Sequence, residues 1–114
     1  MPHFIIDCSE QIVKSKSPKE IIECVYEAAN ATRLFVPKEI KVRINTFKYY
    51  TTGNSDDDFI HVFGNIMQGR NTDQKANLSR QIVSKLKNLF PDVPVISINI
   101  RDFEKATYCN REMV

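Results

Sequence analysis

The second residue of the chain, Pro2, is the strongest candidate for chemistry in this sequence. It follows Met1, and an initiator methionine is usually removed when a small residue such as proline comes next. Removal leaves Pro2 with a free secondary amine at the start of an apolar run. Apolar neighbours disfavour the charged form of an amine and lower its pKa towards neutrality. Pro2 is therefore a candidate general base; alternatively, it only begins an edge strand, where its missing N–H costs nothing.

Three cations are candidates for binding a small carboxylate substrate: Lys41, Arg43 and Arg70. Removing a proton next to a carbonyl builds negative charge on oxygen, and a positioned cation stabilises that charge. Other roles remain open for each of them. Lys41 and Arg43 also suit the exposed face of an edge strand, where positive charge discourages edge pairing. Arg70, which follows Gly69, also suits a solvated loop.

The remaining polar groups do not predict a metal site. His3 and His61 have no third ligand at a recognisable spacing, so packing or an interface hydrogen bond is the expected use of each. Residues 56–58 are three consecutive aspartates in a loop, and consecutive side chains in an extended segment point to alternate sides. Cys8 suits a small buried hydrophobe, and Phe47 and Phe59 suit a core or an interface rather than a substrate wall.

Length and composition indicate one domain covering residues 1–114. The three cysteines are odd in number and widely spaced, which argues against a disulfide framework and favours a reducing compartment. A net charge of +2 is too small to indicate a nucleic-acid partner. The first residues show no basic segment followed by a long apolar region, and no window reaches the apolar length of a membrane span, so we expect neither a leader nor a membrane span. We therefore expect a cytoplasmic protein with neither a nucleic-acid nor a membrane partner.

The first half of the chain predicts a strand, a helix and a strand. Residues 3–7 are apolar and bounded by polar residues, as in a strand. Ser17-Pro18-Lys19-Glu20 combines a hydroxyl N-cap, proline at the first helical position and glutamate at the third. Apolar residues at helical spacing continue from there to about Arg33. Residues 39–47 alternate between apolar and polar, which predicts a strand with one buried face and one positive face.

The second half repeats this pattern, with a turn, a strand, a helix and a strand expected at residues 53–58, 59–67, 72–90 and 95–100. The helix starts at Ser17 and Thr72 are 55 residues apart. Each helix is long enough to return the chain parallel to its first strand. The sequence thus predicts an α+β fold of two duplicated β-α-β units, forming a four-stranded mixed sheet with two helices on one face. The other face requires a cover, and oligomerisation is the simplest one.

A duplicated β-α-β chain that begins Met-Pro resembles the tautomerase superfamily and, within it, the 5-carboxymethyl-2-hydroxymuconate delta-isomerase family. The resemblance runs along nearly the whole chain and is weakest at residues 48–58 and at the tail. Four segments carry it: Pro2-His3-Phe4-Ile5-Ile6-Asp7-Cys8-Ser9, Glu39-Ile40-Lys41-Val42-Arg43-Ile44, Phe59-Ile60-His61-Val62 and Gly69-Arg70.

The resemblance implies a homotrimer that isomerises an unsaturated hydroxy-polycarboxylic acid from aromatic-compound breakdown, with no metal or organic cofactor. Pro2 matches the catalytic base of the family, and Arg70 matches the arginine after the third strand. Lys41 stands where the family carries an arginine, and Arg43 aligns with a second one two residues later. Lysine keeps the charge but loses the planar fork that holds a carboxylate through two bonds. The substrate, and the choice between Lys41 and Arg43, therefore remain open.

Two other functions fit the same order of elements. One is a tautomerase acting on another keto acid, such as a phenylpyruvate-like compound. The other is a non-enzymatic ferredoxin-like binding module, because RNA-recognition domains use such a sheet with aromatic residues displayed on it. Residues 58–64 lack the basic-glycine pair that would precede those aromatic residues, which weighs against RNA.

Overall fold

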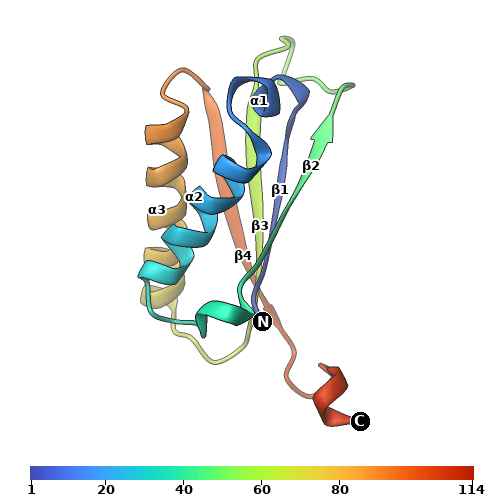
Figure 1. The fold of residues 1–114 in the computed structure, drawn as a ribbon, viewed down its shortest axis with the longest axis vertical. Helices are drawn as coiled ribbons and strands as arrows, with labels where there is room; N and C mark the ends of the chain where they lie inside the picture. The colour runs from blue at the N-terminus through green and yellow to red at the C-terminus, as the bar shows by residue number, and fades with distance from the viewer.

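The computed structural model describes residues 1–114, and it has the predicted α+β architecture of two β-α-β units (Figure 1). The sheet order is β2-β1-β3-β4, with β1 parallel to β2, β3 parallel to β4, and β1 antiparallel to β3. The elements are β1 (His3–Ser9), α1 (Glu10–Ser15), α2 (Pro18–Ala31), the 3₁₀ turn η1 (Pro37–Glu39), β2 (Lys41–Phe47), β3 (Phe59–Met67), α3 (Thr72–Leu89), β4 (Val95–Phe103) and the 3₁₀ turn η2 (Arg111–Met113).

Both long helices begin where side chains satisfy the free backbone N–H groups of the first turn. Ser17 Oγ accepts a hydrogen bond of 3.2 Å from the backbone N–H of Glu20 at the start of α2. At the start of α3, Asn71 and Gln74 form a complete capping box, each side chain accepting from the other residue's backbone N–H. Such caps contribute about 1 kcal/mol each, and they fix where each crossover helix leaves the sheet.

The core lies between the sheet and the helices α2 and α3, which cover one face (Figure 1). Alternate residues of β1 and β3 point into it, because successive side chains of a strand face opposite sides. One apolar stripe of each helix completes it. The fully buried members include Phe4, Ile6, Ile21, Val25, Ile60, Val62, Ile66, Leu78, Ile82 and Leu86. Cys8 is also buried in this core, as predicted, and its burial raises the pKa of the thiol to about 11.

Gly64 occupies a position of β3 where the core has no room for a side chain. A Cβ atom there would lie 2.6 Å from Cδ1 of Ile100 and 3.1 Å from Cε1 of Phe4. We predict that Gly64→Val lowers the free energy of unfolding by about 1–3 kcal/mol, measured by urea denaturation at fixed protein concentration. Gly64→Ala carries the same clashing Cβ atom and should also lose stability. Ile100→Val removes the Cδ1 methyl group that this Cβ would meet, so it should recover part of the loss of Gly64→Ala. Additive effects of Gly64→Ala and Ile100→Val would contradict this packing account.

The structure adds one helix to the expected elements and moves several element ends, among them the end of the first strand, which reaches Ser9. Residues 10–15, to which the sequence analysis assigned no element, form α1, whose single fully buried side chain, Ile12, belongs to the core. The second strand begins at Lys41 and not at Glu39, because Pro37 opens the turn η1 just before it. The fourth strand continues beyond Ile100 to Phe103, pairing with β3 along its whole length.

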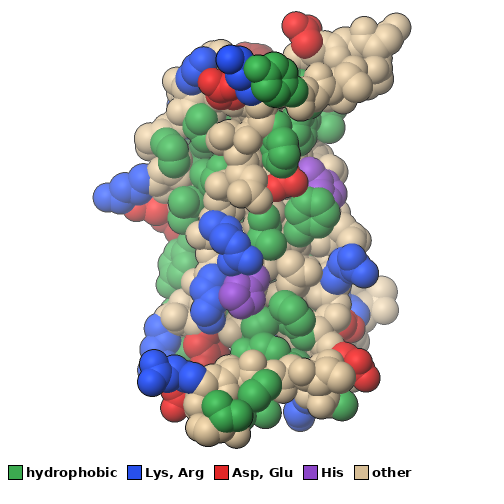
Figure 2. Space-filling model, turned by 90° about the vertical axis from the view of Figure 1, so that its right-hand side faces the viewer, with side chains coloured by type: hydrophobic (Ala, Val, Ile, Leu, Met, Phe, Trp, Pro, Cys, Tyr) green, Lys and Arg blue, Asp and Glu red, His purple; other side chains and the backbone are tan.

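The opposite face of the sheet has no helix over it and carries a mixture of apolar, basic and histidine side chains (Figure 2). Strand register places His3 and Ile5 of β1, Arg43 of β2 and Phe63 of β3 on this face, which we call the open face. Phe63 is 36% exposed and Phe47, also on this face, is 39% exposed.

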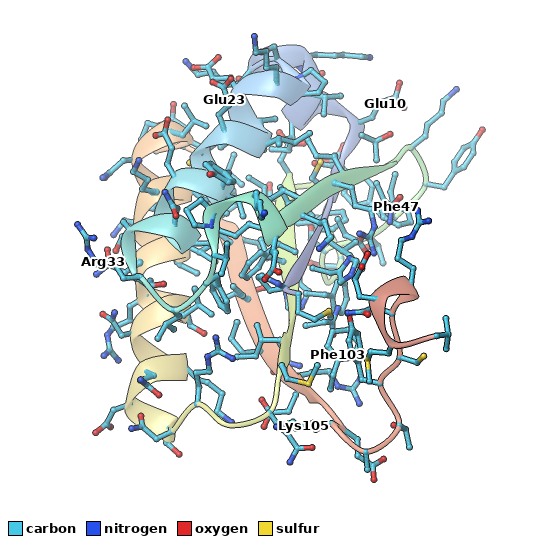
Figure 3. All side chains as sticks on the ribbon, turned by 60° about the horizontal axis from the view of Figure 1, so that its bottom comes forward. Glu10, Glu23, Arg33, Phe47, Phe103 and Lys105 are labelled. Carbon is cyan, nitrogen blue, oxygen red and sulfur yellow. The ribbon has the colours of Figure 1, made fainter.

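Beyond β4 the C-terminal segment runs away from the body of the domain on the side of Phe103 (Figures 1 and 3). No helix of the structure is long and apolar enough to cross a membrane.

Candidate active site

Pro2 lies at the start of β1, at the edge of the core, and is fully buried. Its carbonyl oxygen accepts a hydrogen bond of 3.1 Å from the backbone N–H of Lys41, which fixes the chain end against β2. Met1 precedes it, so the Pro2 nitrogen of this chain is an amide and gains a basic lone pair only when Met1 is removed. A proline held in this way can present its amine in a single orientation, because its ring has no freedom about φ.

The surroundings of the chain terminus lower the pKa of an amine there. The α-amine of Met1 has a pKa below its ordinary value, first because of partial burial and then because of a hydrogen bond with Lys41 and the positive charge of Lys41; Glu39 acts in the opposite direction. Pro2 is the more buried of the two residues, so we expect burial to act on its amine in the same direction when it becomes the terminus. A neutral amine near pH 7 is the form that accepts a proton.

Lys41 and Arg43 extend from β2 on the open face, next to the first residues of β1. The ammonium group of Lys41 donates to the carbonyl oxygen of Glu39 at 2.7 Å, which holds it near the chain terminus. Arg43 Nη1 lies 3.0 Å from Nδ1 of His3. The structure therefore brings three of the four candidate site residues, Pro2, Lys41 and Arg43, to one end of β1.

Arg70 lies at the same end of the sheet but on the side that the helices cover. It follows the end of β3, which reaches the start of β1 because the two strands are antiparallel. Its guanidinium donates to the carbonyl oxygen of Leu34 and lies over the ring of Phe35, 5.3 Å from the centroid. Phe35 in turn packs edge-on against Phe4. Arg70 therefore does not share a face of the sheet with Lys41 and Arg43.

One protomer does not enclose these residues in a pocket. The largest surface hollow, of about 400 Å³, lies between α2 and α3 and is lined by Glu20, Cys24, Lys85 and neighbouring residues. None of the surface hollows is lined by Pro2, Lys41, Arg43 or Arg70. In a single chain Lys41 and Arg43 are exposed on the open face, whereas Pro2 is buried.

The other polar groups singled out in the sequence lie elsewhere. His61 is in β3, 2.7 Å from Ser97 Oγ through its Nδ1. Asp58 accepts a hydrogen bond of 2.8 Å from Ser9 at the far end of β1. Phe47 and Phe59 pack together at that same far end. No group of three or more His, Cys, Asp and Glu side chains is placed to hold a metal ion.

The sequence analysis did not pair His3 with Arg43 or Arg70 with the carbonyl of Leu34. The first contact was within reach of the sequence, because parallel pairing of the first two strands places His3 opposite Lys41 and Ile5 opposite Arg43. The second was not, because it depends on how residues 32–36 leave α2. Arg33 takes a left-handed φ of 59° in that segment, which no residue type there indicates.

A comparison with protein-family models matches residues 2–112 to the family described as 5-carboxymethyl-2-hydroxymuconate isomerase. The chain belongs to this family. It is accordingly an isomerase, and the family predicted from the sequence is confirmed. A search of curated proteins found no match.

Solved structures share the fold of this isomerase at low sequence identity. A 5-carboxymethyl-2-hydroxymuconate isomerase from Deinococcus radiodurans R1 is 19% identical, with a TM-score of 0.82 over 96% of this chain and 88% of that one. A 5-carboxymethyl-2-hydroxymuconate delta-isomerase is 13% identical, with a TM-score of 0.80 over 96% of this chain and 87% of that one. A protein described as a fused 4-OT wild type symmetric trimer is 11% identical, with a TM-score of 0.80 over 98% and 94%.

Proposed function

We propose that this isomerase shifts a proton within an unsaturated hydroxy-polycarboxylic acid such as 5-carboxymethyl-2-hydroxymuconate, with the amine of Pro2 as general base after removal of Met1. The observation that carries the proposal is the buried Pro2 at the start of β1, beside Lys41, in a place that lowers the pKa of a terminal amine. Membership in the isomerase family supports the reaction class. The substrate class follows from the family description and from the cations around Pro2.

The proposed reaction needs one base and a set of cations. The amine takes a proton from the dienol and returns it to another carbon, so the same group serves both steps. Negative charge that develops on the substrate oxygen is stabilised by a cation. Lys41 and Arg43 hold carboxylates of the substrate from the open face, and Arg70 holds one from the helix-covered side at the same end of the sheet. General acid–base catalysis of this kind is worth about 10²–10⁴ in rate. A single positioned donor to a developing oxyanion contributes roughly as much.

The first test of this function is an ultraviolet assay on a sample whose intact mass is known. The assay compares a hydroxymuconate-type dienol with an enol of a phenylpyruvate-like keto acid. The proposal requires loss of Met1 and faster turnover of the polycarboxylate, because three cations suit several carboxylates. Faster turnover of the phenylpyruvate-like enol would favour the second tautomerase activity. A trimmed protein inert towards both would contradict the proposal.

We infer further that the working molecule is a homotrimer. The open face carries the exposed side chains of Phe47 and Phe63 and the half-buried Ile5 with no helix over them, and large exposed apolar faces usually mark interfaces. Lys41 and Arg43 are exposed on that face, so a neighbouring subunit seated there would cover them. A structurally similar protein is described as a symmetric trimer.

Phe63→Glu tests the trimer, because it places a charge in the centre of the proposed interface. We predict that light scattering gives three times the 13.2 kDa chain mass for the wild type and a smaller mass for Phe63→Glu, with isomerase activity falling in parallel. Tyr49→Glu is the matched control, since Tyr49 is 85% exposed in the loop after β2. A monomeric wild type with full activity would contradict the trimer.

A further inference from the structure

His3 is the only side chain that hydrogen-bonds to the guanidinium of Arg43, at 3.0 Å between His3 Nδ1 and Arg43 Nη1. A guanidinium has donors and no acceptor and stays protonated in proteins. His3 Nδ1 must therefore be the acceptor, which requires a neutral imidazole with its proton on Nε2. The contact assigns both the protonation state and the tautomer of His3.

The imidazole of His3 is itself held in place. Its ring packs edge-on against Phe103 of β4, with centroids 6.2 Å apart and an interplanar angle of 74°. On β3 the opposite residue is the uncharged Asn65. A ring held against Phe103 of β4 can direct one N–H of Arg43 and leave the other guanidinium donors free for a ligand.

We propose that His3 is the positioning residue of Arg43: its neutral imidazole orients the guanidinium for the substrate carboxylate, and protonation of His3 releases that orientation and weakens substrate binding. This inference rests on the proposed function only in taking Arg43 as a carboxylate-binding residue. The hydrogen bond and its dependence on protonation belong to the chain whatever it binds.

The charged groups around His3 all oppose its protonation. Arg43 and Lys41 face it from β2, and the terminal amine lies beside it in sequence. Asn65 of β3, which pairs with His3, pairs on its other side with Arg101 of β4. Burial first, then Arg43, Lys41 and the terminal amine, lower the pKa of His3 below its ordinary value. The neutral form therefore persists below the pH at which a free histidine titrates, and the orientation is lost as the pH falls through this lowered pKa.

Two variants separate the hydrogen bond from the packing. In His3→Asn, Oδ1 is bonded to Cγ as Nδ1 is in histidine, so an acceptor that does not titrate replaces the ring nitrogen. His3→Phe keeps a ring against Phe103 and loses the acceptor. We expect His3→Phe to raise KM about 3–10-fold at neutral pH with a smaller change in kcat. We expect His3→Asn to keep KM near that of the wild type and to remove the rise in KM at low pH. The matched control is His61→Asn, which should leave the pH dependence of KM unchanged.

A nitrogen-15 NMR titration tests the contact without any assay of activity. The chain has two histidines, and His61→Asn assigns the resonances. We expect an unprotonated Nδ1 on His3 at neutral pH and a pKa that rises in Arg43→Gln. A protonated Nδ1, or a pKa indifferent to Arg43→Gln, would overturn the inference even if the isomerase activity is present. If the protein has no isomerase activity but the coupling is seen, the contact stands and the proposed function fails.

Discussion

Pro2→Ala is expected to lower kcat for the dienol substrate by roughly 10²–10⁴, the usual worth of a positioned general base. Alanine still permits removal of Met1, and it leaves a primary amine at the terminus. That amine turns freely, whereas the buried proline ring holds its nitrogen in one orientation at the start of β1. Steady-state rates on samples of verified mass measure the difference.

The matched control keeps the Pro2 side chain and changes only the chemical state of its nitrogen, from a free amine to an amide. Wild-type chain with an N-terminal tag left in place has an amide at Pro2, and we expect it to be inactive; cleavage that exposes Pro2 should restore the rate. Activity in the tagged protein equal to that of the cleaved protein would show that the reaction does not use the Pro2 amine. The value of kcat/KM should also fall as the pH drops through the pKa of the Pro2 amine, because only its neutral form accepts a proton.

Arg70→Met is the second large effect that we expect, a loss of kcat/KM of roughly 10–100-fold. The apolar methionine stem can still pack on Phe35, so the change removes mainly the charge and the donors. A charge-assisted hydrogen bond is worth about 1.5–3 kcal/mol, which sets that range. The carbonyl of Leu34 also loses its donor, and the free energy of unfolding should fall by about 1 kcal/mol.

The Arg70 experiment separates a substrate-binding role from a purely structural one. Arg80→Met, on an exposed position of α3, removes the same charge away from the site and should leave both kcat/KM and stability nearly unchanged. If Arg70→Met lowers stability but not kcat/KM, Arg70 serves only to hold the segment after α2. That outcome would remove one of the three proposed carboxylate-binding cations.

The fold was predictable because local signals and the global pattern agree in this chain. Ser17 and Pro18 mark one helix start, and alternation along residues 39–47 and 59–67 marks two strands with one buried face each. The duplication then fixes the pairing of parallel strands around two crossover helices. Helix α1 was missed because six residues with one buried side chain, Ile12, carry no helical period.

The candidate site was predictable in part. Pro2, Lys41 and Arg43 fall together because strands β1 and β2 are parallel and in register at that end. The contacts that orient the cations were not predicted, since they involve backbone carbonyls of Glu39 and Leu34 and the tautomer of His3. Such contacts depend on side-chain geometry, which residue type and spacing do not determine.

The most direct test of the central claim is a titration of the Pro2 amine itself, by NMR of protein labelled with nitrogen-15 proline and freed of Met1. The account predicts a single titration of that nitrogen below the range of a free proline amine, with a higher pKa when Lys41 is replaced by Met, because that change removes a positive charge. An amine that stays protonated far into the alkaline range would contradict it, because such a group is not a base at the pH of the cell.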